Sequence, residues 1–166
     1  SLVLRECSDR EIPVTFRAAG TSLSGQAITD SVLLVAAGHW KDYSINEDGS
    51  QIRLQPGLTG AFINSILAPY GKKIGPDPAS INSATIGGII ANNASGMSSG
   101  TGANAYNTIE SLRLVLADGS VLDTGDEKSR EDFIKSHESL IKEIVDLSNS
   151  VKDNKQLADR IRHKYI

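Results

Sequence analysis

The strongest constraint on this sequence is a long stretch that is almost free of charge. Between Arg53 and Glu110 the only acidic or basic side chains are Lys72, Lys73 and Asp77. The stretch is rich in Gly, Ala, Ser, Thr and Asn, which is not the composition of an ordinary solvated surface. Small side chains also let another molecule approach the backbone closely. We therefore expect this stretch to hold a ligand.

Length and charge exclude several classes of protein. A chain of 166 residues with 39% hydrophobic and 22% charged residues fits one globular domain, and its net charge of -3 argues against a nucleic-acid partner. No apolar run reaches the roughly 18 residues of a membrane span. The single cysteine, Cys7, cannot form an internal disulfide, and no signal peptide is recognisable. These features favour a reducing compartment.

The local patterns predict a mixture of strands and helices. Short strands are expected at residues 13–16 and 32–35, and antiparallel hairpins at 43–55 and 112–123, each turning at an Asp-Gly pair. Helices are expected at residues 2–7, at 59–67 with Thr59 as N-cap, from Ser129 to about 145, and at the C-terminal end. This order favours an α+β domain over a regularly alternating α/β sheet.

The last two predicted helices carry apolar stripes. In the helix that Ser129 would cap, the stripe is expected to be buried and consists of Phe133, Ile134, His137, Leu140, Ile141, Ile144 and Val145. In the helix after it, Leu157, Ile161 and Tyr165 fall on one side.

The first glycine-rich segment is Arg17-Ala-Ala-Gly-Thr-Ser-Leu-Ser-Gly25, directly after a predicted strand. Its glycine spacing is that of a P-loop, but Gln26 and Ala27 stand where a nucleoside triphosphatase needs Lys and Ser or Thr. Terminal phosphoryl transfer is therefore disfavoured. The segment retains the small residues and hydroxyl groups of a phosphate cradle, although a plain turn remains the alternative. Arg17 would either contribute positive charge to a bound phosphate or have a structural role.

The second glycine-rich segment is Thr85-Ile-Gly-Gly-Ile-Ile-Ala-Asn-Asn-Ala-Ser-Gly96. It predicts a helix whose two glycines either allow close helix packing or leave space for a flat ligand. Replacing Gly87 or Gly88 with a bulky residue is then expected to abolish ligand binding and to spare the fold. The nearby Asp77 would hydrogen-bond a ligand hydroxyl or cap the turn between two prolines, and the sequence favours neither.

No residue is assigned a catalytic or metal-binding role. His39, His137 and His163 lie far apart, and none has a His or Cys neighbour at ligand spacing. Cys7 lacks the flanking signature of a nucleophile and is predicted to be a half-buried helical thiol.

Several motifs together resemble a known family over almost the whole chain. The two glycine-rich segments, Gly75-Pro-Asp-Pro-Ala-Ser80 and Leu114-Val-Leu-Ala-Asp-Gly119 are similar to the FAD-binding domain of vanillyl-alcohol-oxidase type (PCMH-type) flavoproteins. Within that family the chain most resembles FAD-linked D-lactate dehydrogenase and glycolate oxidase, including long forms with an iron–sulfur domain. The implied fold is a small parallel βαβ subdomain packed on a mainly antiparallel sheet flanked by helices.

The resemblance implies which residues hold FAD. The first segment would bind the pyrophosphate through Arg17, Ala18, Ala19, Gly20, Thr21, Ser22, Leu23, Ser24 and Gly25. The flavin and ribityl side would be lined by Pro76, Asp77, Ser80, Ser83, Thr85, Gly87 and Gly88, and the cradle would be completed by Asn92, Asn93, Ser95 and Gly96. Because Thr21 stands where covalent members carry a histidine, attachment is expected to be non-covalent.

The resemblance also implies the activity and its limits. The expected reaction is oxidation of a 2-hydroxy acid, such as D-lactate or glycolate, by hydride transfer to FAD. A non-catalytic module that binds a nucleotide or phosphate ligand is the alternative. Residues 1–40 would form a first subdomain and 41–166 a second, with the substrate-binding cap domain and any iron–sulfur cluster outside this sequence. The implied location is the cytoplasm or, for the full-length protein, the surface of the inner membrane.

Overall fold

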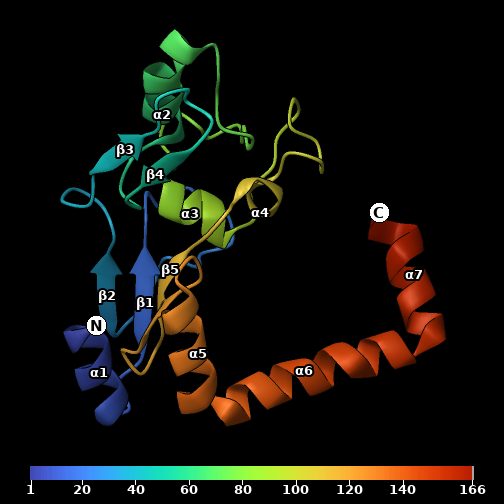
Figure 1. Cartoon of the computed structure of the whole chain (residues 1–166). Helices are drawn as coiled ribbons and strands as arrows, with labels where there is room; N and C mark the ends of the chain where they lie inside the picture. Colours follow the sequence, from blue (N-terminus) through green and yellow to red (C-terminus); the bar gives the residue numbers. More distant parts are fainter. Residues whose placement is uncertain (166) are drawn as a thin grey trace. The chain divides into compact units, whose positions relative to one another are not determined.

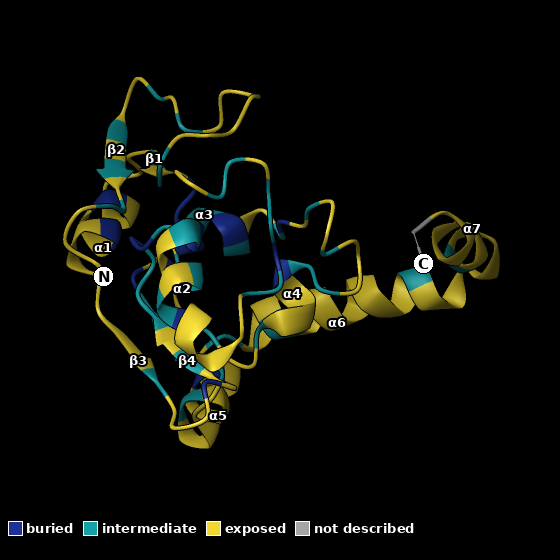
Figure 2. Cartoon of the chain, turned by 90° about the horizontal axis from the view of Figure 1, so that it is seen from above, coloured by how far each residue is buried: buried dark blue, intermediate teal, exposed yellow. Residues whose placement is uncertain are grey.

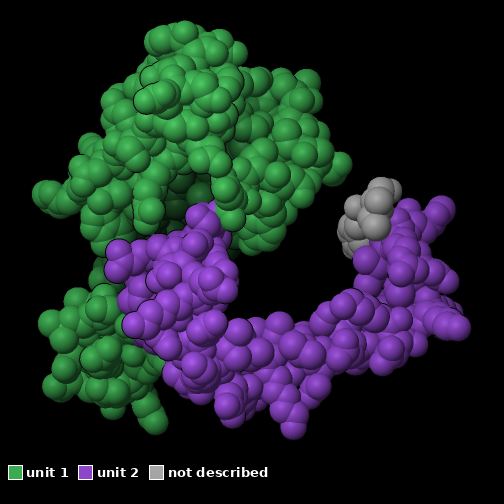
Figure 3. All heavy atoms as spheres, in the orientation of Figure 1, with its two compact units in different colours: residues 1–110, 117–119 green, residues 111–116, 120–166 purple. Residues whose placement is uncertain are grey.

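The computed structural model describes the backbone of residues 1–165 and the side chains of residues 1–164 (Figure 1). The chain divides into two compact units, one made of residues 1–110 with 117–119 and the other of residues 111–116 with the segment from 120 onward (Figure 3). We describe each unit separately. The division near residue 40 that the resemblance implies stays a prediction.

The first unit begins with a helix and a parallel pair of strands. Helix α1 (Leu2–Asp9) precedes β1 (Val14–Arg17), which pairs in parallel with β2 (Val32–Val35). The predicted strands are confirmed, but residues 18–31 connect them as a loop without the helix of a βαβ unit. Gly20 and Gly25 adopt left-handed φ values of 71° and 76° in this loop, a conformation that a right-handed helix cannot contain. The connection therefore exposes the first glycine-rich segment as a loop.

The antiparallel strands form separate hairpins. Strands β3 (Tyr43–Ile45) and β4 (Ile52–Leu54) pair as predicted, with Gly49 in the turn at a φ of 67°. In the second unit, β5 (Arg113–Val115) pairs with β6 (Val121–Asp123). Within residues 1–165 each sheet has two strands, so the antiparallel part is not one continuous sheet. Each of these strands is three residues long, which limits the edge that a further strand could join.

The core of the first unit lies beneath two short helices, α2 (Gly60–Leu67) and α3 (Ile86–Ala91). Thr59 caps α2 as predicted, because its side chain accepts a hydrogen bond from the backbone N–H of Phe62. A 3₁₀ turn (Ala68–Tyr70) follows α2, and α4 (Ala105–Thr108) follows α3. Figure 2 shows buried positions on both α2 and α3. The buried apolar cluster consists of Leu58, Ile63, Leu67, Ala84, Ile86, Ile89, Ala94 and Ala105.

The second unit contains three helices after its hairpin: α5 (Glu127–Ser136), α6 (Glu138–Asp153) and α7 (Lys155–Tyr165). Two sequence predictions are wrong here. Asp126, rather than Ser129, caps α5, and the single long helix is broken at His137. The His137 ring stacks on Phe133 at 4.0 Å, and Nδ1 lies 2.8 Å from the Ser136 hydroxyl. The break lies in the His137 backbone, whose φ of -127° and ψ of 36° are outside the helical range.

The predicted apolar stripe of this region is mostly exposed. Phe133 is buried, whereas Ile134, Leu140 and Ile144 are 51%, 41% and 55% exposed. Amphipathic spacing predicted the helices correctly but could not show that little in the second unit packs against this face.

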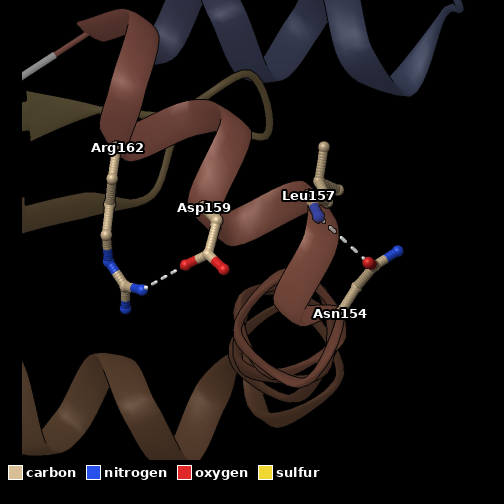
Figure 4. Close-up of polar contacts among 4 residues, drawn as sticks. All are labelled: Asn154, Leu157, Asp159 and Arg162. Carbon is tan, nitrogen blue, oxygen red and sulfur yellow. Dashed lines mark hydrogen bonds and ion pairs between the residues drawn. The ribbon is translucent and has the colours of Figure 1, made fainter.

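The predicted last helix is confirmed as α7. Figure 4 shows its first turn, where the Asn154 side chain accepts a hydrogen bond from the Leu157 N–H at 3.0 Å, and an ion pair between Arg162 and Asp159 at 3.1 Å. Leu157 and Ile161 are each 37% exposed; the side chain of Tyr165 lies outside the described side chains. None of the helices described is both long enough and apolar enough to span a bilayer.

Candidate functional site

The two glycine-rich segments meet at one cavity of the first unit, with a volume of about 730 Å³. This volume is within the range of small-molecule and cofactor sites. The segments are far apart in the sequence, and the fold brings them together. The residues that line the cavity are Phe16, Ala18, Ala19, Gly20, Thr21, Ser22, Gln26, Ala27, Ala36, Trp40, Pro56, Pro78, Ser80, Ala84, Thr85, Gly87, Gly88, Ile89, Ala91, Asn92 and Ala94.

Backbone hydrogen bonds fix α3 against the rest of the cavity wall. The N–H of Gly87 donates to the carbonyl of Pro56 at 3.0 Å, and the N–H of Ile86 donates to the carbonyl of Leu58 at 2.8 Å. Ile86 and Ile89 are at most 6% exposed and anchor the helix in the core. The residues of α3 that face the cavity are therefore held on a packed element.

No charged side chain lines the cavity. The nearest cation that the geometry identifies is Arg17, whose guanidinium lies over Gly20: a Cβ added there would be 2.8 Å from Arg17 Nη2. A ligand that carries phosphates would thus meet hydroxyl groups and backbone amides at the wall, with one arginine beside the loop.

Thr85 lines the cavity, and its buried hydroxyl group is unpaired among the residues that the structure describes. The residue is 5% exposed, and its Oγ1 has no hydrogen-bond partner among the residues that the structure describes. Although Thr85 precedes α3, its side chain does not cap the helix. A buried polar atom without a partner costs free energy, and such groups in native proteins usually find one. A polar ligand would supply that partner if the wall around Oγ1 adjusted on binding.

The two glycines of α3 have different surroundings. A Cβ on Gly87 would lie 2.8 Å from the Cβ of Pro56, whereas a Cβ on Gly88 would meet only the Cβ of Ala18, at 3.3 Å. Gly87 therefore permits close packing of α3 against Pro56, and Gly88, which lines the cavity, lies close to Ala18 of the first glycine-rich loop. Close packing is thus shown for Gly87, whereas space for a flat ligand beside Gly88 stays a prediction.

Asp77 hydrogen-bonds the backbone beyond the second glycine-rich segment, and its predicted contact with a ligand hydroxyl stays a prediction. Its carboxylate oxygens accept hydrogen bonds from the backbone N–H groups of Ser98, at 3.2 Å, and Ser99, at 3.1 Å. Gly96 approaches Asp77 so closely that a Cβ there would overlap its oxygens. Hydrogen bonding, first from the Ser98 side chain, keeps the pKa of the Asp77 carboxyl below its ordinary value. Asp77 thus ties residues 75–80 to the end of the second glycine-rich segment.

Other predicted site residues have positions outside the cavity lining. Leu23 is fully exposed, and Asn93 adopts a left-handed φ of 45° while its Oδ1 accepts a hydrogen bond from Tyr106 N–H at 2.9 Å. The Ser83 hydroxyl donates to the Ser80 carbonyl at 3.3 Å. The predicted residues outside the lining are Arg17, Leu23, Ser24, Gly25, Pro76, Asp77, Ser83, Asn93, Ser95 and Gly96.

Sequence reasoning missed several residues of the cavity wall. Phe16, Ala36, Trp40 and Pro56 line it, although none belongs to a glycine-rich motif. Their spacing offered no signal. Pro78 lies inside the motif of residues 75–80, and Ala84 directly precedes the second glycine-rich segment.

Hydrogen exchange tests whether the Asp77 carboxylate holds the backbone of Ser98 and Ser99. Because folding lowers the pKa of this carboxyl, its stabilising contribution is present above the unfolded pKa of about 3.9 and is lost as pH falls through the lower folded pKa. We expect Asp77→Asn to speed hydrogen exchange at the Ser98 and Ser99 amides at neutral pH. Asp48→Asn is the control, because Asp48 also has a lowered pKa but hydrogen-bonds Ser50. Unchanged exchange at Ser98 and Ser99 would show that the Asp77 carboxylate does not hold these two amides.

A smaller cavity of about 460 Å³ lies in the second unit beside β6 and α5. Its wall includes Asp126, Lys128 and Asp132, so it differs from the uncharged cavity of the first unit. None of the predicted ligand-binding residues lines it.

Comparison with known proteins finds a matching family model and similar sequences. Residues 1–125 match the family model FAD_binding_4, described as FAD binding domain. The chain is 39% identical over 97 residues to glycolate oxidase subunit GlcD of Escherichia coli K12, covering 57% of this chain and 19% of the relative. It is 29% identical over 126 residues to the D-lactate dehydrogenase of Archaeoglobus fulgidus, covering 75% of this chain and 28% of the relative.

Solved structures show the same fold. A structure of 6-hydroxy-D-nicotine oxidase from Arthrobacter nicotinovorans superposes with a TM-score of 0.64 at 20% identity, covering 76% of this chain and 28% of that one. The expected α+β architecture of the PCMH-type FAD-binding domain is thereby confirmed. In each of these matches, this chain spans less than a third of the other protein's length.

Proposed function

Because this chain belongs to the FAD binding domain family, we propose that it is the FAD-binding domain of a flavin-dependent oxidoreductase that oxidises a 2-hydroxy acid such as D-lactate or glycolate. The observation that carries the proposal is the convergence of both glycine-rich segments on one uncharged cavity. The names of the relatives, glycolate oxidase and D-lactate dehydrogenase, support the substrate class. FAD would accept a hydride from the α-carbon of the substrate.

The residues of the cavity fit such a cofactor. Backbone amides of residues 18–22, with the hydroxyl groups of Thr21 and Ser22, would bind the pyrophosphate, and Arg17 would balance part of its charge. Thr85 would donate to or accept from the ligand through its unpaired Oγ1. Gly88 would leave the space in which the ligand passes α3. These assignments rest on the lining of the cavity and on the environment of each residue.

The absence of a histidine from the first loop supports non-covalent attachment. Thr21 lines the cavity, and a threonine hydroxyl is a poor nucleophile without an adjacent base. The flavin would therefore leave with the supernatant when the protein is precipitated in acid. Substrate-binding residues, the electron acceptor and any iron–sulfur cluster are proposed to belong to parts of the protein outside this sequence.

Calorimetric titration tests the cofactor. We expect FAD to bind far more tightly than FMN or ATP, because only FAD reaches both glycine-rich segments at once. ATP binding as tight as FAD binding would instead favour a nucleotide-binding module. If none of the three binds to the folded chain, the cavity assignment is wrong.

The activity is tested separately on the native protein. Without oxygen, addition of a suitable 2-hydroxy acid is expected to bleach the visible absorption of bound FAD. Comparing glycolate, D-lactate and L-lactate would show which substituent size and which configuration at the α-carbon the protein accepts. Bound FAD that stays oxidised with each 2-hydroxy acid offered would contradict the proposed reaction but not the cofactor.

A further inference from the structure

The cavity of the second unit holds a serine and a histidine whose side chains meet. Ser120 directly precedes β6, and His137 stands between α5 and α6. The Ser120 hydroxyl oxygen lies 3.2 Å from Nε2 of His137, and both residues line the cavity. A serine within hydrogen-bond distance of an imidazole nitrogen is the arrangement in which enzymes activate a hydroxyl group.

Two contacts hold the His137 ring in place. The ring stacks on the buried ring of Phe133, with a centroid distance of 4.0 Å and an interplanar angle of 11°. Its Nδ1 lies 2.8 Å from the Ser136 hydroxyl oxygen. The main chain is anchored as well, because the His137 N–H donates to the Phe133 carbonyl at 2.9 Å. Nε2 is therefore held in its direction towards Ser120.

The hydrogen bonds of Ser136 determine which ring nitrogen carries the proton. The Ser136 hydroxyl donates to the carbonyls of Asp132 and Phe133, at 2.9 and 3.2 Å. A hydroxyl group has one hydrogen, so towards His137 the Ser136 oxygen is the acceptor and Nδ1–H is the donor. In the neutral ring, Nε2 then has no hydrogen and accepts the Ser120 O–H. This is the tautomer that a general base for Ser120 requires.

The charges and the size of the cavity restrict its ligand. The described wall includes the carboxylates of Asp126 and Asp132 and the ammonium group of Lys128. Two negative charges against one positive charge disfavour an anionic ligand. The volume of about 460 Å³ is within the range of small-molecule sites. A small uncharged molecule fits both limits.

We propose that Ser120 is a nucleophile activated by His137, and that this cavity takes small uncharged esters as acyl donors. The Ser120 oxygen attacks the ester carbonyl, and its proton passes to Nε2 of His137. The bond between the carbonyl carbon and the leaving oxygen then breaks as Nε2 returns the proton, so an alcohol leaves and Ser120 carries the acyl group. Water releases this group as a carboxylic acid by the same steps. Ser120 and His137 are catalytic residues, and Ser136 is a positioning residue.

Labelling of the whole chain with an uncharged fluorophosphonate tests the nucleophile. The reagent loses fluoride when an activated serine attacks its phosphorus. We expect the adduct on the tryptic peptide of residues 114–128, whose only serine is Ser120. Unfolding in urea should abolish the labelling, because residues 120 and 137 meet only in the folded chain. An unlabelled chain, or a label confined to another peptide, would overturn the inference and leave the FAD assignment untouched.

Variants measured with the fluorophosphonate and with p-nitrophenyl acetate separate the roles. Ser120→Ala is expected to lose the label, and His137→Gln to slow labelling and ester cleavage by about a hundredfold or more, the contribution of a general base. Ser129→Ala is the matched control and should keep the wild-type rates. Ser129 lines the same cavity, but its hydroxyl oxygen accepts a hydrogen bond from the Asp123 N–H at 2.9 Å. Undiminished labelling of a folded His137→Gln chain would overturn the inference.

Nitrogen NMR of the His137 ring tests the positioning role of Ser136. The wild-type ring is expected to be the Nδ1–H tautomer. In Ser136→Ala the Nε2–H tautomer should gain population and labelling should slow about tenfold, the equivalent of one hydrogen bond. Ser136→Thr keeps the hydroxyl group and should retain both properties. A wild-type ring in the Nε2–H tautomer would overturn the inference, because Nε2 could not then accept the Ser120 proton.

Discussion

Replacing Gly88 with leucine is expected to abolish FAD binding and to leave the chain folded. The added side chain would start 3.3 Å from the Cβ of Ala18, with no other atom outside its own helix within 4 Å, and would extend into the space between α3 and the first glycine-rich loop. We expect FAD affinity to fall by more than about a hundredfold in calorimetry, because ligand and side chain cannot share that space. The free energy of unfolding should change by about 1 kcal/mol or less, since leucine is the better helix former.

Two other glycines are informative comparisons for this variant. Gly102→Leu adds the same side chain where nothing lies within 4 Å of the Cβ, so FAD affinity should be unchanged. Gly87→Leu would clash with Pro56 and should destabilise the fold itself. This corrects the expectation that either glycine of α3 could be enlarged without cost to the fold. Full FAD affinity in Gly88→Leu would show that the ligand does not pass α3.

Replacing Thr85 with valine is expected to have opposite effects on the free and the bound chain. Valine has nearly the same shape and lacks the buried hydroxyl that has no partner among the described residues. The free energy of unfolding without ligand should therefore rise by about 1 kcal/mol. FAD affinity should fall about tenfold, because the cofactor loses a hydrogen bond. Thermal unfolding with and without FAD measures both effects.

Thr59→Val is the matched control for Thr85→Val. Thr59 faces Thr85 across an isolated antiparallel bridge, and its side chain caps α2. Its loss should destabilise the chain by about 1 kcal/mol with FAD affinity unchanged. Thr85→Ser keeps the hydroxyl and should retain FAD binding. If Thr85→Val destabilised the free chain and bound FAD normally, the Thr85 hydroxyl would have no role at the ligand.

The sequence predicted those parts of the site whose chemistry is local. Small residues and hydroxyl groups mark the segments around Gly20 and Gly88 without reference to the rest of the chain. Trp40 and Pro56 reach the cavity wall through contacts with Gly57 and Gly87 that form only on folding. Nothing in the sequence around Trp40 and Pro56 indicates these contacts. Wall residues contributed by tertiary contacts were therefore missed.

The same distinction explains the predictions about the fold. Turn residues and strand propensity identified the β3–β4 and β5–β6 hairpins, because Asp-Gly turns act over a few residues. Helical periodicity passed over His137, where the backbone departs from the helical conformation. The connection between β1 and β2 lacks a helix because its glycines adopt left-handed conformations. Periodicity does not report such backbone conformations.

The uncharged wall of the cavity also determines how this sequence can vary over evolution. A wall made of backbone and small side chains is selected for its volume more than for the identity of each residue. Ala and Ser can therefore interchange along the wall at little cost, whereas Gly20, with its left-handed backbone, and Gly87, packed on Pro56, cannot take a side chain without strain.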